Sequence, residues 1–176
     1  VYTKPTEGNI LKLNTTDGIG SSSHFRTMTL STFQLSGNAD VNANNNNFIA
    51  YCFANVPGYQ RIGSWVGGGS TDVTVVTGFK PRFVLAKNSS GSFNWFIADS
   101  ERATSNPFDE LVYADTNETQ GTSGAGDHIR FNNDGFTIEG NANTLNQSGS
   151  TFVYLAIGDD EIGSDEDCLV DVPNAV

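Results

Sequence analysis

The hydrophobic pattern of this chain contains the same apolar run twice. The first run (residues 48–55) reads Phe-Ile-Ala-Tyr-Cys-Phe-Ala-Asn, and the second run (residues 152–159) reads Phe-Val-Tyr-Leu-Ala-Ile-Gly-Asp. Each run is entered from a tract of Asn, Gly and Ser residues and is closed by Asn or Asp. A short continuous apolar run between turn residues is typical of a strand that is buried on both faces. We therefore expect both runs to form buried strands.

The rest of the pattern predicts short strands and turns. Period-two alternation predicts two half-buried strands at 25–30 and 33–35, and an edge strand at 10–14. Residues 110–114 fit either a strand or one helical turn. The Asn-rich tract 37–47 predicts a polar loop, and Val-Pro-Gly-Tyr at 56–59 predicts a turn. Further strands are expected at 73–76, 82–86 and 94–98.

Turn signals recur about every ten residues, which is typical of a sandwich or barrel. No stretch longer than about two turns has apolar residues at helical spacing. The pattern thus predicts an all-β fold, an antiparallel β-sandwich of jelly-roll type.

An internal repeat divides the chain. His-x-Arg occurs at 24–26 and again at 128–130, an offset of 104 positions, and the two apolar runs have the same offset. Between them, residues 32–39 match residues 135–142 at an offset of 103. Similarity at a fixed period indicates a repeated structural unit.

The repeat predicts a complete β unit at 59–163 and an acidic tail or linker at 164–176. Residues 1–58 hold a half copy that matches only residues 107–160. Because open sheet edges recruit other strands, we expect this half copy to be completed by preceding sequence, by a neighbouring chain, or by joining the second unit in one larger sandwich.

Composition narrows the function classes. The net charge of -11, from 20 acidic and 9 basic residues, disfavours binding to nucleic acid. No window approaches the roughly 18 consecutive apolar residues of a membrane span, so no membrane insertion is expected. The chain starts at Val1 and its only methionine is Met28, which suggests a processed chain or part of a longer one.

The two cysteines lie in unlike places. Cys52 occupies the position of Ala156 in the repeat and is interpreted as a small hydrophobic residue, whereas Cys168 lies in the acidic tail. A disulfide between them stays open as an alternative, and no CxxC metal motif is present.

Candidate catalytic motifs are weak. His24 and His128 share one repeat position beside Arg26 and Arg130, which favours a structural role over a general base. The glycine-rich stretch 63–69 lacks the Lys-Ser/Thr ending of a phosphate-binding loop and is interpreted as a hairpin loop. No nucleophile elbow or activated cysteine motif occurs.

Four further groups of residues have a functional and a structural interpretation. Five carboxylates could hold the acid/base pair of a glycosidase, but surface solvation is favoured: Asp99, Glu101, Asp109, Glu110 and Asp115. The acidic segments 159–161 and 165–167 could bind a cation, but a solvated linker is favoured. Aromatic residues that could stack on sugars, but are more often core residues, are Tyr59, Trp65, Trp95 and Tyr113. Asn-x-Ser/Thr glycosylation motifs begin at Asn14, Asn88, Asn117 and Asn146 and carry little weight in so Asn-rich a chain.

We therefore predict no catalytic, cofactor-binding or metal-binding residue, and no enzyme activity.

Several segments of the chain resemble a known family. The segments are 47–59, 63–70, 77–87, 94–100 and 151–157. Together they resemble a repeated domain in large virion proteins, the tail-fibre-like and appendage proteins of tailed phages, especially those that infect marine bacteria. Residues 73–76 depart from that domain, where a Gly-Pro-bearing stretch is more usual.

The resemblance implies a non-enzymatic structural module at the virion surface, in a tail fibre, another appendage or a capsid decoration. Its implied partners are other virion proteins and further copies of itself, with host-surface glycans as a secondary partner. Two alternatives stay open: a carbohydrate-binding or carbohydrate-active β-sandwich, and a subunit of a self-assembling extracellular fibre.

Overall fold

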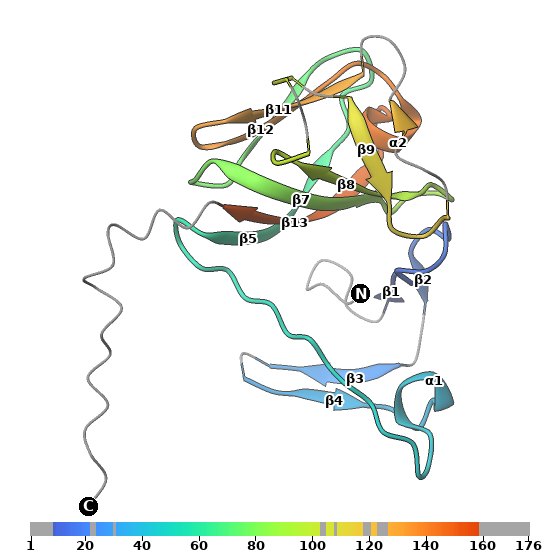
Figure 1. Ribbon diagram of the computed structural model, residues 1–176. Coiled ribbons are helices and arrows are strands. Elements are labelled where there is room, and N and C mark those ends of the chain that lie inside the picture. The colour runs from blue at the N-terminus through green and yellow to red at the C-terminus, as the bar shows by residue number, and fades with distance from the viewer. Residues whose placement is uncertain are drawn as a thin grey trace, which may run out of the picture.

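Antiparallel strands make up most of the computed structural model, which confirms the all-β prediction (Figure 1). The structure describes residues 9–21, 24–29, 31–102, 105–107, 109–117, 121–122 and 127–158. Its elements are β1 (Asn9–Ile10), β2 (Gly20–Ser21), β3 (Phe25–Met28), β4 (Phe33–Leu35), α1 (Ala39–Asn42), β5 (Gln60–Val66), β6 (Val73–Val76), β7 (Pro81–Asn88), β8 (Trp95–Asp99), β9 (Glu110–Tyr113), β10 (Gly121–Thr122), β11 (His128–Asn132), β12 (Gly135–Glu139), α2 (Asn143–Asn146) and β13 (Thr151–Gly158).

Two sheets form the main body of the molecule. The larger sheet has six strands in the order β10-β9-β8-β7-β13-β5, and the smaller has three in the order β11-β12-β6. They lie as two layers, with β11 and β12 over β7, β8 and β13 (Figure 1). The antiparallel sandwich expected from the sequence is therefore present.

Strand β13 is an interior strand of the larger sheet. It pairs with β5 along one edge and with β7 along the other, so that Leu155 lies opposite both Ile62 and Leu85. Most of β13 is buried. The prediction of a buried strand is confirmed for the second run.

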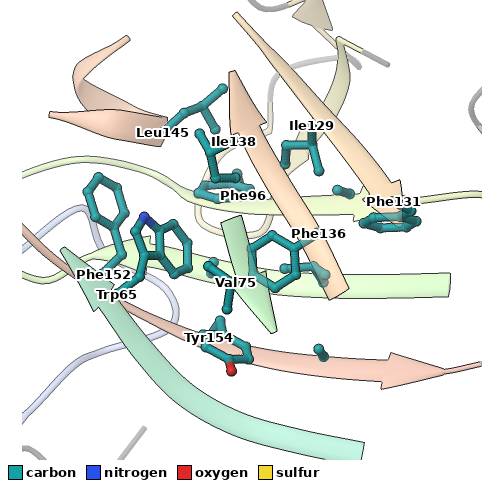
Figure 2. Close-up of a cluster of buried hydrophobic side chains, with 14 of the residues drawn as sticks. Trp65, Val75, Phe96, Ile129, Phe131, Phe136, Ile138, Leu145, Phe152 and Tyr154 are labelled. Atoms are coloured by element: carbon teal, nitrogen blue, oxygen red, sulfur yellow. The ribbon is translucent and has the colours of Figure 1, made fainter. Parts of the chain in front are cut away.

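The core between the two sheets is built around aromatic side chains. Trp65 of β5 stacks on Phe152 of β13, with ring centroids 4.8 Å apart and an interplanar angle of 7°. Phe136 of β12 meets Trp65 edge-on at 5.7 Å and Tyr154 edge-on at 5.4 Å. Figure 2 shows these rings between the layers, together with Ile129, Ile138 and Leu145. Side chains at alternate positions of β13 point into this core, as the period of two requires.

The opposite face of the larger sheet is partly covered by the N-terminal segment. Leu11 packs with Trp95 and Val153, and the Trp95 indole N–H donates to the Lys12 carbonyl at 2.8 Å. The buried Lys87 ammonium donates to the carbonyls of Thr16 (3.0 Å) and Phe93. Burial lowers the pKa of Lys87 below its ordinary value, against the opposing charges of Asp115 and Asp17. These contacts hold residues 9–21 on the sandwich.

The glycine-rich stretch 63–69 is not a hairpin loop, because the strands on either side of it lie in different sheets. Residues 63–66 belong to β5, which pairs with β13, whereas β6 pairs with β12. The chain therefore crosses from one layer to the other after Val66. Gly67 allows this close approach, since a Cβ at that position would lie 2.1 Å from the Gln147 carbonyl oxygen.

Replacing Phe152 by Ala should destabilise the fold by about 3–5 kcal/mol, because the ring is fully buried against Trp65. The matched control is Phe48→Ala at the equivalent repeat position, where the ring is half exposed and we expect a cost below about 1 kcal/mol. Urea unfolding followed by tryptophan fluorescence measures both values. Equal costs at the two positions would contradict the assignment of the core.

Candidate assembly surface

The first apolar run is not a buried strand, and here the prediction from the sequence is wrong. Residues 48–55 have no strand assignment and every one of them is exposed. Ile49 and Tyr51 are 81% and 80% exposed, whereas Phe152 and Ala156 in the second run are 0% exposed. Figure 1 shows this run as an extended segment between α1 and β5.

The physical reason is the lack of neighbouring strands. The second run is buried because β5 and β7 pair with its two edges and the smaller sheet covers one face. Among the described residues, no strand pairs with the first run. In the described part of the chain, the hydrogen bonds of this run lie at its end, where the Ile62 backbone N–H donates to the Asn55 side chain at 2.7 Å and the Gln60 side chain donates to the Ala54 carbonyl at 2.6 Å. The turn predicted at 56–59 follows and is confirmed.

The half copy before the first run keeps the local structure of the complete unit. The hairpin β3–β4 corresponds to β11–β12, and its Phe25 and Phe33 rings meet edge-on at 6.0 Å. The two predicted strands are therefore present, but they are mostly exposed rather than half-buried. The predicted polar loop 37–47 contains the single helical turn α1.

The N-terminal hairpin β1–β2 also has a counterpart in the complete unit. In β1–β2, Ile10 pairs with Gly20, and in β9–β10, Leu111 pairs with Gly121. Both hairpins thus join residues ten positions apart. The element order β1, β2, β3, β4, α1, first run matches the order β9, β10, β11, β12, α2, β13.

Asn146, at the end of α2, makes the contacts that join the two sheets. Its side-chain amide donates to the carbonyls of Gly69, Thr71 and Gly140 at 2.8, 3.0 and 2.8 Å. Its side-chain oxygen accepts from the Gly68 backbone N–H at 2.8 Å. The residue is fully buried, so these contacts satisfy side-chain polar atoms of Asn146 that lie in the interior. The sequence marked Asn146 only as a glycosylation motif, which its burial argues against.

Asn42, at the end of α1, is the counterpart of Asn146 in the half copy. Its side-chain amide donates to the Ser36 carbonyl at 2.9 Å, six residues back, as Asn146 does to Gly140. Asn42 is exposed, and no contact of the kind that Asn146 makes to 68–71 occurs at Asn42 among the described residues. The half copy therefore has the helix-end geometry of the complete unit without the crossover loop.

The two histidines lie at the starts of equivalent strands. His24 lies just before β3 and its Nε2 is 3.2 Å from an Asp40 carboxylate oxygen, while His128 is the first residue of β11. Near His128, Arg130 pairs with Glu139 at 2.7 Å. These contacts lie within each hairpin and its helix, in agreement with a structural interpretation.

The five candidate carboxylates are distributed along β8, β9 and their ends. Asp99 accepts from the Glu101 backbone N–H at 2.9 Å, Glu101 pairs with Arg82, and Asp115 accepts from the Trp95 backbone N–H at 3.2 Å. Glu110 begins β9 and Asp109 precedes it, and both are partly buried. In the part of the chain that the structure describes, no three His, Cys, Asp or Glu side chains are grouped so as to hold a metal ion.

The remaining candidates separate into buried and exposed residues. Trp65 and Trp95 are core residues, Tyr113 is half-buried and Tyr59 is exposed. Asn88 is buried, like Asn146, whereas Asn14 and Asn117 are exposed. Cys52 is exposed and has a free thiol, so it is not the small core residue that its repeat position suggested. Cys168 and both acidic segments (159–161 and 165–167) lie outside the described residues.

The fold and its repeated halves define an all-β sandwich protein with an exposed apolar segment. A model of the family described as a domain of unknown function, DUF7483, matches residues 2–160, and the chain belongs to this family. Comparison with curated proteins and with solved structures found no match. Among the described residues, no helix is long and apolar enough to cross a membrane.

Replacing Asn146 by Ala should destabilise the protein by about 3 kcal/mol or more, because four backbone groups lose the hydrogen bonds of a fully buried side chain at once. Asn42→Ala is the matched control, and its single hydrogen bond at an exposed site predicts a loss below about 1 kcal/mol. Chemical denaturation of both variants provides the comparison. A mild effect of Asn146→Ala, equal to that of the control, would refute its role in joining the sheets.

Proposed function

We propose that this chain is a structural module of a phage virion, part of a tail fibre, another appendage or a capsid decoration, and that it acts in particle assembly rather than in catalysis. The observation that carries the proposal is the exposed first run, whose repeat counterpart β13 is an interior strand of a six-stranded sheet, paired on both edges. The resemblance to repeated virion domains, noted from the sequence, supplies the biological setting.

The physical argument concerns the unpaired edges of the first run. An extended apolar segment with open backbone N–H and C=O groups is a template for pairing with another strand. Proteins use such segments for recognition by strand addition, in which backbone hydrogen bonds give affinity and alternate side chains give specificity. The large exposed side chains grouped on this run are Phe48, Ile49, Tyr51 and Phe53. A contiguous exposed apolar group of this kind marks an interaction site.

The composition fits an assembled particle. The net charge of -11 opposes nonspecific aggregation of the free chain, so that association depends on the pairing of particular strands. The polar loops, rich in Asn, Gly and Ser, would face solvent in such an assembly.

The test is incorporation into virions. Virions that carry this chain are purified, and their proteins are quantified by mass spectrometry alongside the unassembled fraction. We expect the chain at a constant number of copies per particle, with antibody labelling on an appendage or on the capsid. Recovery of the chain only from the unassembled fraction would contradict the proposed function.

A paired substitution links incorporation to the first run. The double variant Ile49→Asp with Tyr51→Asp should fold normally, because both side chains are about 80% exposed, yet its incorporation should fall at least about tenfold. Asn44→Asp with Asn46→Asp, at exposed positions just before the run, adds the same charge and should leave incorporation unchanged. Equal incorporation of the two double variants would exclude the first run as the assembly surface.

A further inference from the structure

We infer that the N-terminal half (residues 9–58) binds a second block of strands with the pattern of β5–β8 (residues 60–99), which enters from the N-terminal side of β1. The inference rests on the proposed assembly function, because it names the partner of that surface. It follows from comparing the two copies of the repeat strand by strand.

In the complete unit, three strands of the second half (β9, β12 and β13) pair with strands of one contiguous block, β5–β8. Strand β9 pairs with β8, strand β12 pairs with β6, and β13 pairs with both β7 and β5. The equivalents in the N-terminal half are β1, β4 and the first run. Among the described residues, each of these three lacks the corresponding neighbour. One block with the pattern of β5–β8 would supply all four missing strands.

In the complete unit, the block β5–β8 buries aromatic side chains of β12 and β13, and the N-terminal half has aromatic side chains at the equivalent positions. Phe136 of β12 lies opposite Val75 and is fully buried, whereas its counterpart Phe33 is 38% exposed. Phe152 is covered by Trp65, whereas its counterpart Phe48 is 47% exposed. A second block would place a tryptophan over Phe48 and a valine over Phe33, and so bury both rings.

The asparagine at the end of α1 is positioned to bind a crossover loop like the one between β5 and β6. Asn146 binds the backbone of residues 68–71, which connect β5 to β6, and binds Gly140 on its own side. Asn42 already makes the bond on its own side, to Ser36. A loop with the pattern of residues 67–71 would complete the other three hydrogen bonds at Asn42. Three observations thus indicate the same partner: the unpaired strands, the exposed aromatic rings and the position of Asn42.

In this chain, and so in any second copy of it, the strands β5–β8 already pair with strands of their own unit. Strand β7 has β8 on one edge and β13 on the other, and β6 and β5 pair with β12 and β13. A second copy would have to give up its own β13 to accept the first run. Within the unit, the chain passes from β8 into β9, so the same topology places the partner block ahead of β1.

The experiment uses Cys52 as a reporter in a Cys168→Ser background. Cys52 is exposed, and its counterpart Ala156 is fully buried between Arg61 and Val84 on the neighbouring strands. A copy of residues 59–108 is fused ahead of Asn9 in place of residues 1–8. We expect the reaction of Cys52 with a thiol reagent to slow at least about 100-fold in the fusion. A control fusion carries Trp65→Asp and Val84→Asp in the added block only, and its Cys52 should stay reactive.

Register provides an independent readout. Arg61→Cys in the added block would lie opposite Cys52, as Arg61 lies opposite Ala156, and a disulfide should form under mild oxidation. Gln60→Cys is the matched control, since a shift of one residue moves the side chain to the other face and should prevent the disulfide. Formation of the disulfide from position 61 alone supports the inference.

Two results would overturn the inference. One is a Cys52 that reacts equally fast in both fusions, together with no preference for position 61. The other is slow reaction of Cys52 in the unfused chain together with self-association, which would identify a second copy as the partner. Virion incorporation is measured separately. If the chain is found in particles but Cys52 stays reactive in the fusion, this inference is refuted and the proposed function stands.

Discussion

Pairing along both edges of β13 is the constraint on which the rest of the structure depends. Buried backbone groups must be hydrogen-bonded, and a strand can be buried on both faces only when neighbouring strands satisfy its two edges. Strands β5 and β7 meet this need for β13, and the core of Trp65, Phe136 and Phe152 forms above it. The first run has a similar sequence and lacks those neighbours, so it stays extended and exposed. Burial of this sequence is therefore decided by its partners rather than by its composition.

The crossover at Gly67 and the amide of Asn146 couple the two layers of the sandwich. Residues 67–71 leave the larger sheet, and Asn146 binds their backbone before the smaller sheet begins at β6. This contact makes the first block of the unit and its second half mutually dependent. A half without its block therefore keeps its local hairpin and its helical turn but not its core, as the described residues 24–29 and 31–55 do.

The amino-acid sequence was sufficient to predict strands of the complete unit. It was not sufficient to predict whether the first run is buried. Apolar residues between turn signals located β6, β7 and β8, because the side chains of these strands follow the pattern that is usual for strands in a sheet. The pattern at 48–55 predicted a buried strand, and this was wrong because a local pattern carries no information about which strands lie beside a segment. Asn146 was missed for the same reason, since its partners lie more than seventy positions away, at Gly68 and Gly69. The repeated Gly-Asn-Ala at 37–39 and 140–142 was the one signal that pointed to this region.

Hydrogen exchange resolved by residue in the 176-residue chain tests the central claim most directly. The account predicts that the amides of residues 48–54 exchange at close to unprotected rates, while those of residues 152–158 exchange only on global unfolding. Protection of both runs to a similar degree would contradict it, because the first run would then already have its sheet partners.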